Sequence, residues 1–228
     1  MKAMILAAGF GNRMRPLTLT TPKPLLQVGQ KSLIVWHIEA LKKIGVTEIV
    51  INAAWLKEKL VETLGDGQQF GVNIIWSLED EGLETAGGII QALPHLGEAP
   101  FIVVNGDVWT RYDFSQLLNV ELADHLAHLV LVDNPPQHLQ GDFTLSGQKV
   151  FTPDQQQGGE TLTFSGISLL SPKLFAGLTT GKRPLAPLLK HAMQQGLVTG
   201  EKMNTVWVDV GTPERLSQLD EKITLQMI

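Results

Sequence analysis

Hydrophobic positions in the first half of the chain alternate between short continuous apolar runs and longer stretches with a helical period. The apolar runs predict strands of the buried, parallel type, and they cover residues 2–8, 48–53, 72–76 and 101–104. The periodic stretches predict helices at residues 32–44, 55–64 and 84–93, with Gly45 at an expected helix C-cap. This repetition of strand and helix is typical of a doubly wound α/β structure.

The pattern is looser after residue 113. Further strands are expected at residues 129–132, 163–170 and 206–210, a hairpin at 143–145 and 150–151, and a polar loop at 153–160. Helices are expected at residues 184–195 and 213–225, each with a proline near its first turn. No internal repeat and no linker interrupts the sequence, so residues 1–228 are expected to form one domain.

The composition excludes several classes of protein. Hydrophobic residues make up 43% of the 228 residues, and there is no cysteine for a disulfide, a thiolate metal site or a cysteine nucleophile. No apolar stretch approaches the roughly 18 residues of a membrane span, so a cytoplasmic protein with no membrane partner is expected. The net charge of −5 argues against a nucleic-acid partner, because phosphates along a polymer are bound by a basic surface.

Positive charge is concentrated at the N-terminal end. Residues 1–31 hold five basic side chains and no acidic one, whereas the rest of the chain holds 13 basic and 23 acidic side chains. A local positive cluster on an acidic protein favours a compact polyanion, such as a triphosphate, as the ligand. The five basic residues are Lys2, Arg13, Arg15, Lys23 and Lys31.

A glycine-containing loop follows the first predicted strand. Gly9 and Gly11 allow backbone N–H groups to approach an anion, and Arg13 and Lys23 supply positive charge nearby. A dinucleotide-binding loop, GxGxxG, would need a third glycine where this chain has Met14, and a Walker A loop would need a GK[ST] sequence that does not follow. The pattern therefore predicts a phosphate-binding loop of another kind.

The stretch LAAGFGNRMRPLT at residues 6–18 resembles the signature LAAGxGTRxxPLT of the sugar-phosphate nucleotidyltransferases. The sequence PKPL at residues 22–25 matches the motif that follows it, and Asn12 stands where threonine is usual. The resemblance implies that Arg13 and Lys23 are catalytic, with Lys23 on the α-phosphate and Arg15 as a supporting charge. It implies that the triphosphate is held by Ala8, Gly9, Gly11, Asn12, Arg13 and Lys23.

The same resemblance implies a Rossmann-like α/β fold. We expect a doubly wound, mixed but mainly parallel sheet with a small β insertion for the sugar. Residues 1–110 are expected to form the nucleotide-binding half, and residues 111–228 the sugar-binding half.

Two aspartates are candidate magnesium ligands. Asp107 follows the strand predicted at residues 101–104, where an open α/β sheet places its ligands, and Asp209 lies in WVDVGTPE at residues 207–214. Mg²⁺ usually takes one or two carboxylates together with substrate phosphates. The family binds its metal through an acid in a GD motif and a second acid near the C-terminal end, which implies that Asp107 and Asp209 hold Mg²⁺.

Further segments match the family's base and sugar pockets. LETAGGII at residues 83–90 resembles the family's LGTAGAI, although Glu84 replaces the usual glycine, and it implies base contacts from Thr85, Gly87 and Gly88. The family's common EKP sequence is missing from the sugar side. The resemblance implies that the sugar phosphate is bound by Asn105, Asp142, Glu160, Ser165 and Gly166.

Within the family, the resemblance is to members that use UTP and N-acetylmuramate 1-phosphate in peptidoglycan recycling, and it implies these two partners. GTP with mannose 1-phosphate, and UTP or dTTP with glucose 1-phosphate, remain open. A non-catalytic nucleotide-sugar sensor is a further alternative, but such a protein would be expected to lose Arg13, Lys23, Asp107 or Asp209. An NAD-dependent oxidoreductase is excluded because Met14 stands where the dinucleotide-binding loop needs its third glycine. We expect a monomer.

Overall fold

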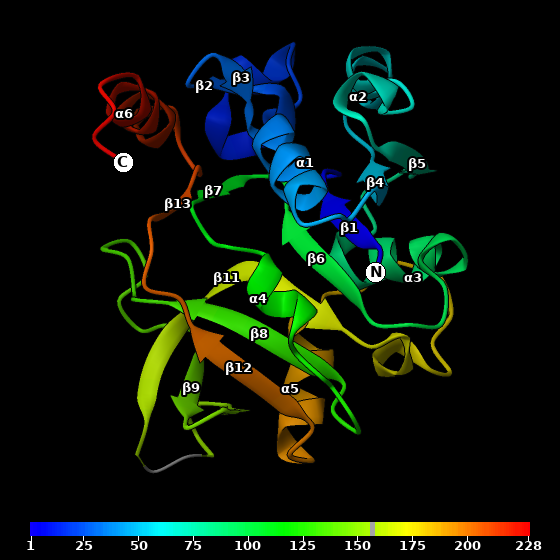
Figure 1. Cartoon of the computed structure of the whole chain (residues 1–228), viewed down its shortest axis with the longest axis vertical. Coiled ribbons are helices and arrows are strands. Elements are labelled where there is room, and N and C mark those ends of the chain that lie inside the picture. The colour runs from blue at the N-terminus through cyan, green and yellow to red at the C-terminus, as the bar shows by residue number, and fades with distance from the viewer. Residues whose placement is uncertain (156–157) are drawn as a thin grey trace.

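The computed structural model describes residues 1–155 and 158–228, and its centre is a nine-stranded sheet of order β5-β4-β1-β6-β11-β8-β12-β10-β9 (Figure 1). Four of these strands, predicted from their apolar runs, pair in parallel. They are β1 (Ala3–Leu6), β4 (Glu48–Ala53), β5 (Asn73–Leu78) and β6 (Phe101–Asn105).

The other five strands form the second part of the sheet, where β11 pairs antiparallel with β6 and β8, and β12 pairs parallel with β8. The mixed sheet is as expected, but the parallel part is confined to the first four strands and this one later pair. The five strands are β8 (Ala127–Val132), β9 (Phe143–Ser146), β10 (Lys149–Phe151), β11 (Glu160–Leu170) and β12 (Val198–Lys202).

Helices cover both faces of the sheet because side chains alternate between its faces along each strand. On one face Ile5 packs in a core with Ile34 and Ile38 of α1, and on the other Met4 packs in a core with Ile89 of α3. This confirms the doubly wound arrangement. The helices are α1 (Leu33–Lys43), α2 (Lys57–Leu64), α3 (Glu84–Leu96), α4 (Ser115–Leu118), α5 (Ala186–Gln194) and α6 (Pro213–Thr224). None of those in the described ranges is long and apolar enough to cross a membrane.

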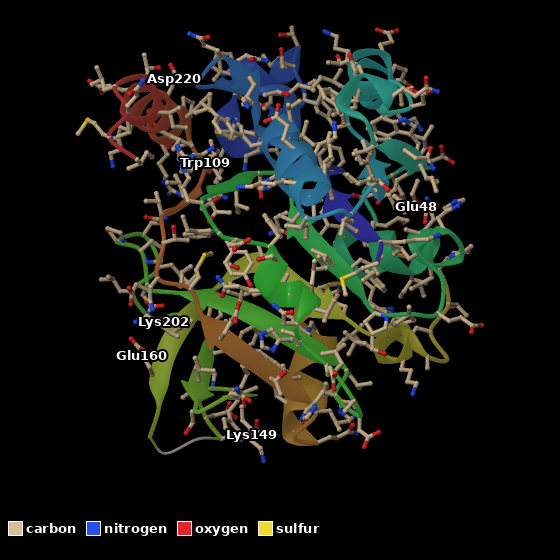
Figure 2. All side chains as sticks on the ribbon, viewed as in Figure 1. Glu48, Trp109, Lys149, Glu160, Lys202 and Asp220 are labelled. Carbon is tan, nitrogen blue, oxygen red and sulfur yellow. The ribbon has the colours of Figure 1, made fainter. Side chains whose placement is uncertain are left out.

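A third, smaller core joins the C-terminal helix α6 to the N-terminal loops. Trp109, labelled in Figure 2, is fully buried there beside Met14 and Leu219. Two short pairs of strands frame this core: β2 (Gln27–Val28) with β3 (Lys31–Ser32), and β7 (Val108–Thr110) with β13 (Trp207–Asp209). Short 3-10 helices lie at Asn12–Met14, Leu17–Leu19, Lys23–Leu25, Gln68–Phe70 and Pro172–Phe175.

Some predicted boundaries differ from the structure. Helix α3 continues through Pro94 to Leu96, three residues beyond the expected end. The polar loop expected at residues 153–160 includes residues 156–157, which lie outside the described ranges, and its last residue, Glu160, already begins β11.

Candidate active site

The candidate site lies where the order of the parallel strands reverses. Strand β1 lies between β4 and β6: the chain runs from β1 through β4 to β5 on one side and then crosses to β6 on the other side of β1. Ligands of open α/β sheets bind in the crevice at such a point, beyond the carboxyl ends of the strands. The ends of β1 and β6 are tied together there, because the N–H of Gly106 donates to the carbonyl of Leu6 at 2.8 Å.

A cavity of about 380 Å³ opens at this crevice. Its wall includes the backbone that follows β1, the end of β6, and the loop that begins α3. Six predicted site residues line it, and they are Ala8, Gly9, Lys23, Thr85, Asn105 and Asp107. The structure therefore brings together residues of four separate motifs in one cavity large enough for a small ligand.

Lys23 and Asp107 face each other in this cavity. The ammonium nitrogen of Lys23 lies 2.7 Å from Oδ2 of Asp107, and the lysine side chain is only 8% exposed. Burial of a lysine in this way is favourable only with a partner charge or hydrogen bonds. The carboxylate is more exposed, at 39%, so its other oxygen can reach a ligand in the cavity.

Asp209 is held beside Asp107 by backbone pairing. Strands β13 and β7 place Asp209 opposite Val108, and the N–H of Val210 donates to the carbonyl of Asp107 at 3.1 Å. The guanidinium of Arg215 donates to Oδ2 of Asp209 at 2.7 Å and to its carbonyl oxygen at 3.2 Å. The two predicted metal ligands, 102 residues apart in sequence, thus come from adjacent backbone segments.

Sequence reasoning did not identify Arg215. The sequence did contain a signal for it: Thr212 directly precedes the helix expected from Pro213, and it caps that helix by accepting a hydrogen bond from the N–H of Arg215. A residue in the first turn of that helix points back toward the strand before it. Arg13 also lies here: its guanidinium is 3.3 Å from the position a Cβ on Gly211 would occupy.

The remaining phosphate-loop residues lie beside the first cavity and do not line it. Asn12 and Arg13 are exposed on a 3-10 helix, and the hydroxyl of Thr18 donates to the carbonyl of Gly11 at 2.8 Å. Met14 ends this helix as a fully buried member of the third core. A core anchor at this position explains why the loop departs from GxGxxG.

Two of the predicted base-contacting glycines pack against protein. A Cβ on Gly87 would lie 2.3 Å from the carbonyl oxygen of Gly181, and one on Gly88 would lie 2.6 Å from Nδ2 of Asn52 and 2.7 Å from Oε1 of Glu79. Neither glycine lines this cavity or the second one described below. At both positions the structure shows close packing at the start of α3.

A buried polar network, missed in the sequence, supports both the phosphate loop and this helix start. Oδ1 of Asn52 accepts from the N–H of Ala7 at 2.9 Å, and Nδ2 of Asn52 donates to Oε1 of Glu79 at 2.7 Å. Oε2 of Glu79 in turn accepts from the N–H of Leu83 at 2.9 Å. Asn52 and Glu79 are 2% and 1% exposed. The network fixes the two walls of the cavity relative to one another.

Phe10, Glu84 and Lys182 are among the residues that line the first cavity without having been predicted to do so. Phe10 is 48% exposed, and a Cβ on Gly82 would lie 2.9 Å from its ring. Glu84 has a φ of +60°, a left-handed conformation that explains why the family uses glycine there. Lys182 reaches the cavity from the loop before α5, with its nitrogen 3.9 Å from Oε1 of Glu84.

A second cavity of about 290 Å³ adjoins the first and shares Leu6, Thr85 and Asn105 with it. Asp142 lines it and accepts from the N–H of Phe164 at 2.8 Å, while Nε2 of His138 lies 2.9 Å from its other oxygen. Asn105 and Asp142, two of the residues predicted to bind the sugar phosphate, thus line the same cavity.

Gly166 also lines the second cavity, in a β-bulge of β11. Its φ is +81°, and a Cβ there would lie 2.6 Å from Nδ2 of Asn105, so only glycine fits. Its neighbour Ser165 is fully buried and donates to the carbonyl of Val130 at 2.6 Å, which gives it a place in the bulge and not in the wall of a cavity.

Glu160 lies apart from both cavities. It forms a 2.7 Å ion pair with Lys202, and Figure 2 shows the two side chains at the outer edge of the second part of the sheet. The first residue of β11 is thus far along the strand from the bulge at Gly166.

Comparisons with known proteins agree with this geometry. Residues 2–143 match the family model described as nucleotidyl transferase. The chain is 53% identical to N-acetylmuramate alpha-1-phosphate uridylyltransferase of Neisseria meningitidis over 96% of both chains. It is 35% identical to mannose-1-phosphate guanyltransferase of Saccharomyces cerevisiae, spanning 62% of that longer protein.

Solved structures show the same fold. A Bacillus anthracis protein assigned as a glucose-1-phosphate thymidylyltransferase superposes with a TM-score of 0.84 at 24% identity, covering 98% of this chain and 95% of that one. HddC from Yersinia pseudotuberculosis superposes with a TM-score of 0.79 at 22% identity, covering 97% and 98%. The sequence matches and the motifs together show that this chain belongs to the nucleotidyl transferases.

Proposed function

We propose that the protein transfers UMP from UTP to N-acetylmuramate 1-phosphate, giving UDP-N-acetylmuramate and pyrophosphate, as a step of peptidoglycan recycling. Family members bind a nucleoside triphosphate and a sugar phosphate and typically use a divalent metal ion. The observation that carries the proposal is the pair of adjoining cavities, which share Leu6, Thr85 and Asn105. UTP and the muramate are proposed from the 53% identity to the Neisseria enzyme over 96% of both chains.

The proposed reaction is an in-line displacement at the α-phosphorus of UTP. A phosphate oxygen of the sugar 1-phosphate forms the new P–O bond, and the bond to the β-phosphate bridging oxygen breaks with its electron pair leaving on pyrophosphate. The nucleophile is already anionic, so no general base is needed. Positioning and charge neutralisation carry the rate in such transfers, and we assign these roles to Lys23 and Arg13.

We propose Mg²⁺ as the metal, held by Asp107 and Asp209. Two hard carboxylates next to a phosphate loop suit Mg²⁺, which completes its shell with water and substrate phosphates. When bound, the ion neutralises phosphate charge and orients the phosphates. Lys23 and Arg215 hold one carboxylate each, at 2.7 Å, and so fix the orientation of the proposed ligands.

Mannose 1-phosphate with GTP is a second candidate, favoured by the 35% identity to the yeast guanyltransferase. Glucose 1-phosphate with UTP or dTTP belongs to the same chemistry. A non-catalytic sensor is disfavoured because Arg13, Lys23, Asp107 and Asp209 are all present. We also propose a monomer.

The test measures pyrophosphate release by the protein with Mg²⁺, each of UTP, dTTP, GTP and CTP, and the 1-phosphates of N-acetylmuramate, glucose and mannose. Release confined to UTP and N-acetylmuramate 1-phosphate is expected. Another active pair would replace the substrates but keep the chemistry, and no release with any pair would favour the sensor.

The metal assignment has its own test. Asp107→Asn is expected to lower turnover by orders of magnitude while the thermal unfolding midpoint changes little, because the amide loses the charge that would hold the metal but its oxygen can still accept from the buried ammonium of Lys23. Near-normal turnover by this variant would remove Asp107 from the metal site.

A further inference from the structure

The proposed acceptor poses an electrostatic problem for the site. Under the proposed function, on which this inference rests, the acceptor carries a carboxylate on its lactyl ether in addition to its phosphate. The walls of the two cavities already contain three acidic side chains, those of Glu84, Asp107 and Asp142. An anionic group placed in such surroundings needs a positive partner.

Few cations are available to meet this need. Among the described residues that line the cavities, only Lys23 and Lys182 are positively charged, and both belong to the first cavity. Lys23 is buried and engaged with Asp107 at 2.7 Å. The second cavity is walled largely by apolar side chains, and Asp142 is the one acidic residue among the described residues that line it.

The backbone places Lys182 at the border between the cavities. The N–H of Gly87 donates to the carbonyl of Arg183 at 3.1 Å, and the N–H of Arg183 donates to the carbonyl of Leu83 at 2.9 Å. These two bonds fix the segment on the start of α3. Lys182 lines the first cavity and Pro184, two residues on, lines the second.

The side chain of Lys182 is free to take a new partner. It is 65% exposed, and its nitrogen lies 3.9 Å from Oε1 of Glu84, which is beyond hydrogen-bond distance. An exposed ion pair of this kind contributes little by itself. Glu84 keeps its carboxylate on the same side of the first cavity as the lysine, although its backbone has a left-handed conformation that favours glycine.

We propose that Lys182 binds the carboxylate of the sugar substrate and thereby distinguishes an acid-bearing sugar 1-phosphate from a neutral one. The acetamido and ring groups then lie toward the apolar second cavity. The lactyl carboxylate then faces the wall shared at Thr85, on the side of the first cavity, which Lys182 also lines.

The experiment compares two acceptors that differ only in the lactyl group, N-acetylmuramate 1-phosphate and N-acetylglucosamine 1-phosphate. For each, kcat/KM is measured with UTP in the wild type, in Lys182→Met and in Lys182→Arg. Where the neutral sugar is not turned over, its inhibition constant against the muramate is used instead. Lys190→Met, on the exposed side of α5, is the matched control.

We expect Lys182→Met to lose about tenfold or more in kcat/KM for the muramate, from loss of a charge-assisted hydrogen bond. The constant for the neutral sugar and the KM for UTP should be unchanged, and Lys182→Arg should retain most of the preference. An equal loss for both acceptors, or no loss, would overturn the proposal. If the wild type fails to use the muramate at all, the proposed function fails first, so the two failures are distinguishable.

Discussion

Replacing Asn52 by aspartate tests whether the buried network beneath the phosphate loop requires Asn52 as the donor and Glu79 as the acceptor of their hydrogen bond. In the structure Nδ2 of Asn52 donates to Oε1 of Glu79 at 2.7 Å, and its Oδ1 accepts from the N–H of Ala7. Asn52→Asp keeps the shape and the acceptor for Ala7. It replaces the donor by an oxygen that faces a carboxylate oxygen inside the protein.

The expected destabilisation depends on pH. With both carboxyls ionised, two charges about 4 Å apart at an effective dielectric constant of about 20 repel by about 4 kcal/mol. With one proton between them, the O–H replaces the lost N–H donor and the loss should fall below about 1 kcal/mol. The pKa of the introduced carboxyl is therefore raised above its unfolded value of about 3.9. Its folded state binds more protons, so stability falls as pH rises.

The assay is urea unfolding of wild type and Asn52→Asp at about pH 5 and about pH 8. We expect a difference in unfolding free energy of about 2 kcal/mol at the lower pH, where holding the proton about one pH unit above the unfolded pKa already costs about 1.5 kcal/mol, and about 4 kcal/mol at the higher. Combining Asn52→Asp with Glu79→Gln reverses the polarity, because the introduced amide can donate to the aspartate while its oxygen accepts from the N–H of Leu83. This pair should regain stability at about pH 8. Equal destabilisation at both pH values, or no recovery in the pair, would refute the reasoning.

Two further predictions concern the core and the sugar cavity. Burial lowers the pKa of His37 from 6.5 to about 4, so its neutral ring contributes roughly 3 kcal/mol above pH 6.5 that is lost as pH falls toward 4. His37→Gln, which can still donate to the carbonyl of Val108, should flatten the acid side of the stability–pH curve, and an unchanged slope would contradict this. Gly166→Ala should raise the KM of the sugar phosphate more than that of UTP, because its Cβ would displace Asn105. Gly177→Ala, at a similar φ of +75° but in open space, should lose about 1–2 kcal/mol of stability, and Gly166→Ala should lose more because its Cβ also meets Asn105. An equal change in the KM of the sugar phosphate in the two variants would contradict the role of this contact.

The parts of the fold that the sequence predicted are those with strong local periodicity. The apolar runs of β1, β4 and β6 are buried on both faces, so their composition alone identifies them. Strand β12, with the sequence VTGEK, was missed because only Val198 and Gly200 are buried along it. Its pairing with β8 depends on a partner about 70 residues away, which periodicity cannot detect.

The site shows the same division between local and non-local information. Lys23 and Asp107 could be singled out in the sequence because each belongs to a contiguous motif. Asn52 and Glu79 were missed because each looks like an ordinary polar residue near the end of a strand, and their contact spans 27 residues across neighbouring strands. Gly88 was predicted to contact the base, but the pattern could not show that its close neighbours are these two side chains.

The turn after β6 couples the two cavities mechanically. Asn105 lies in the wall of both, and Asp107 follows two residues later in the first cavity. Between them, the 2.8 Å bond from Gly106 to Leu6 fixes the turn on the neighbouring strand, while Gly166 packs against Asn105 from the other side. A displacement of this turn would move the proposed metal ligand and the sugar wall together. A transfer that relies on alignment of two phosphates, and not on a proton-transferring side chain, is most sensitive to such a displacement. The rigid turn is therefore where the fold contributes most directly to the proposed chemistry.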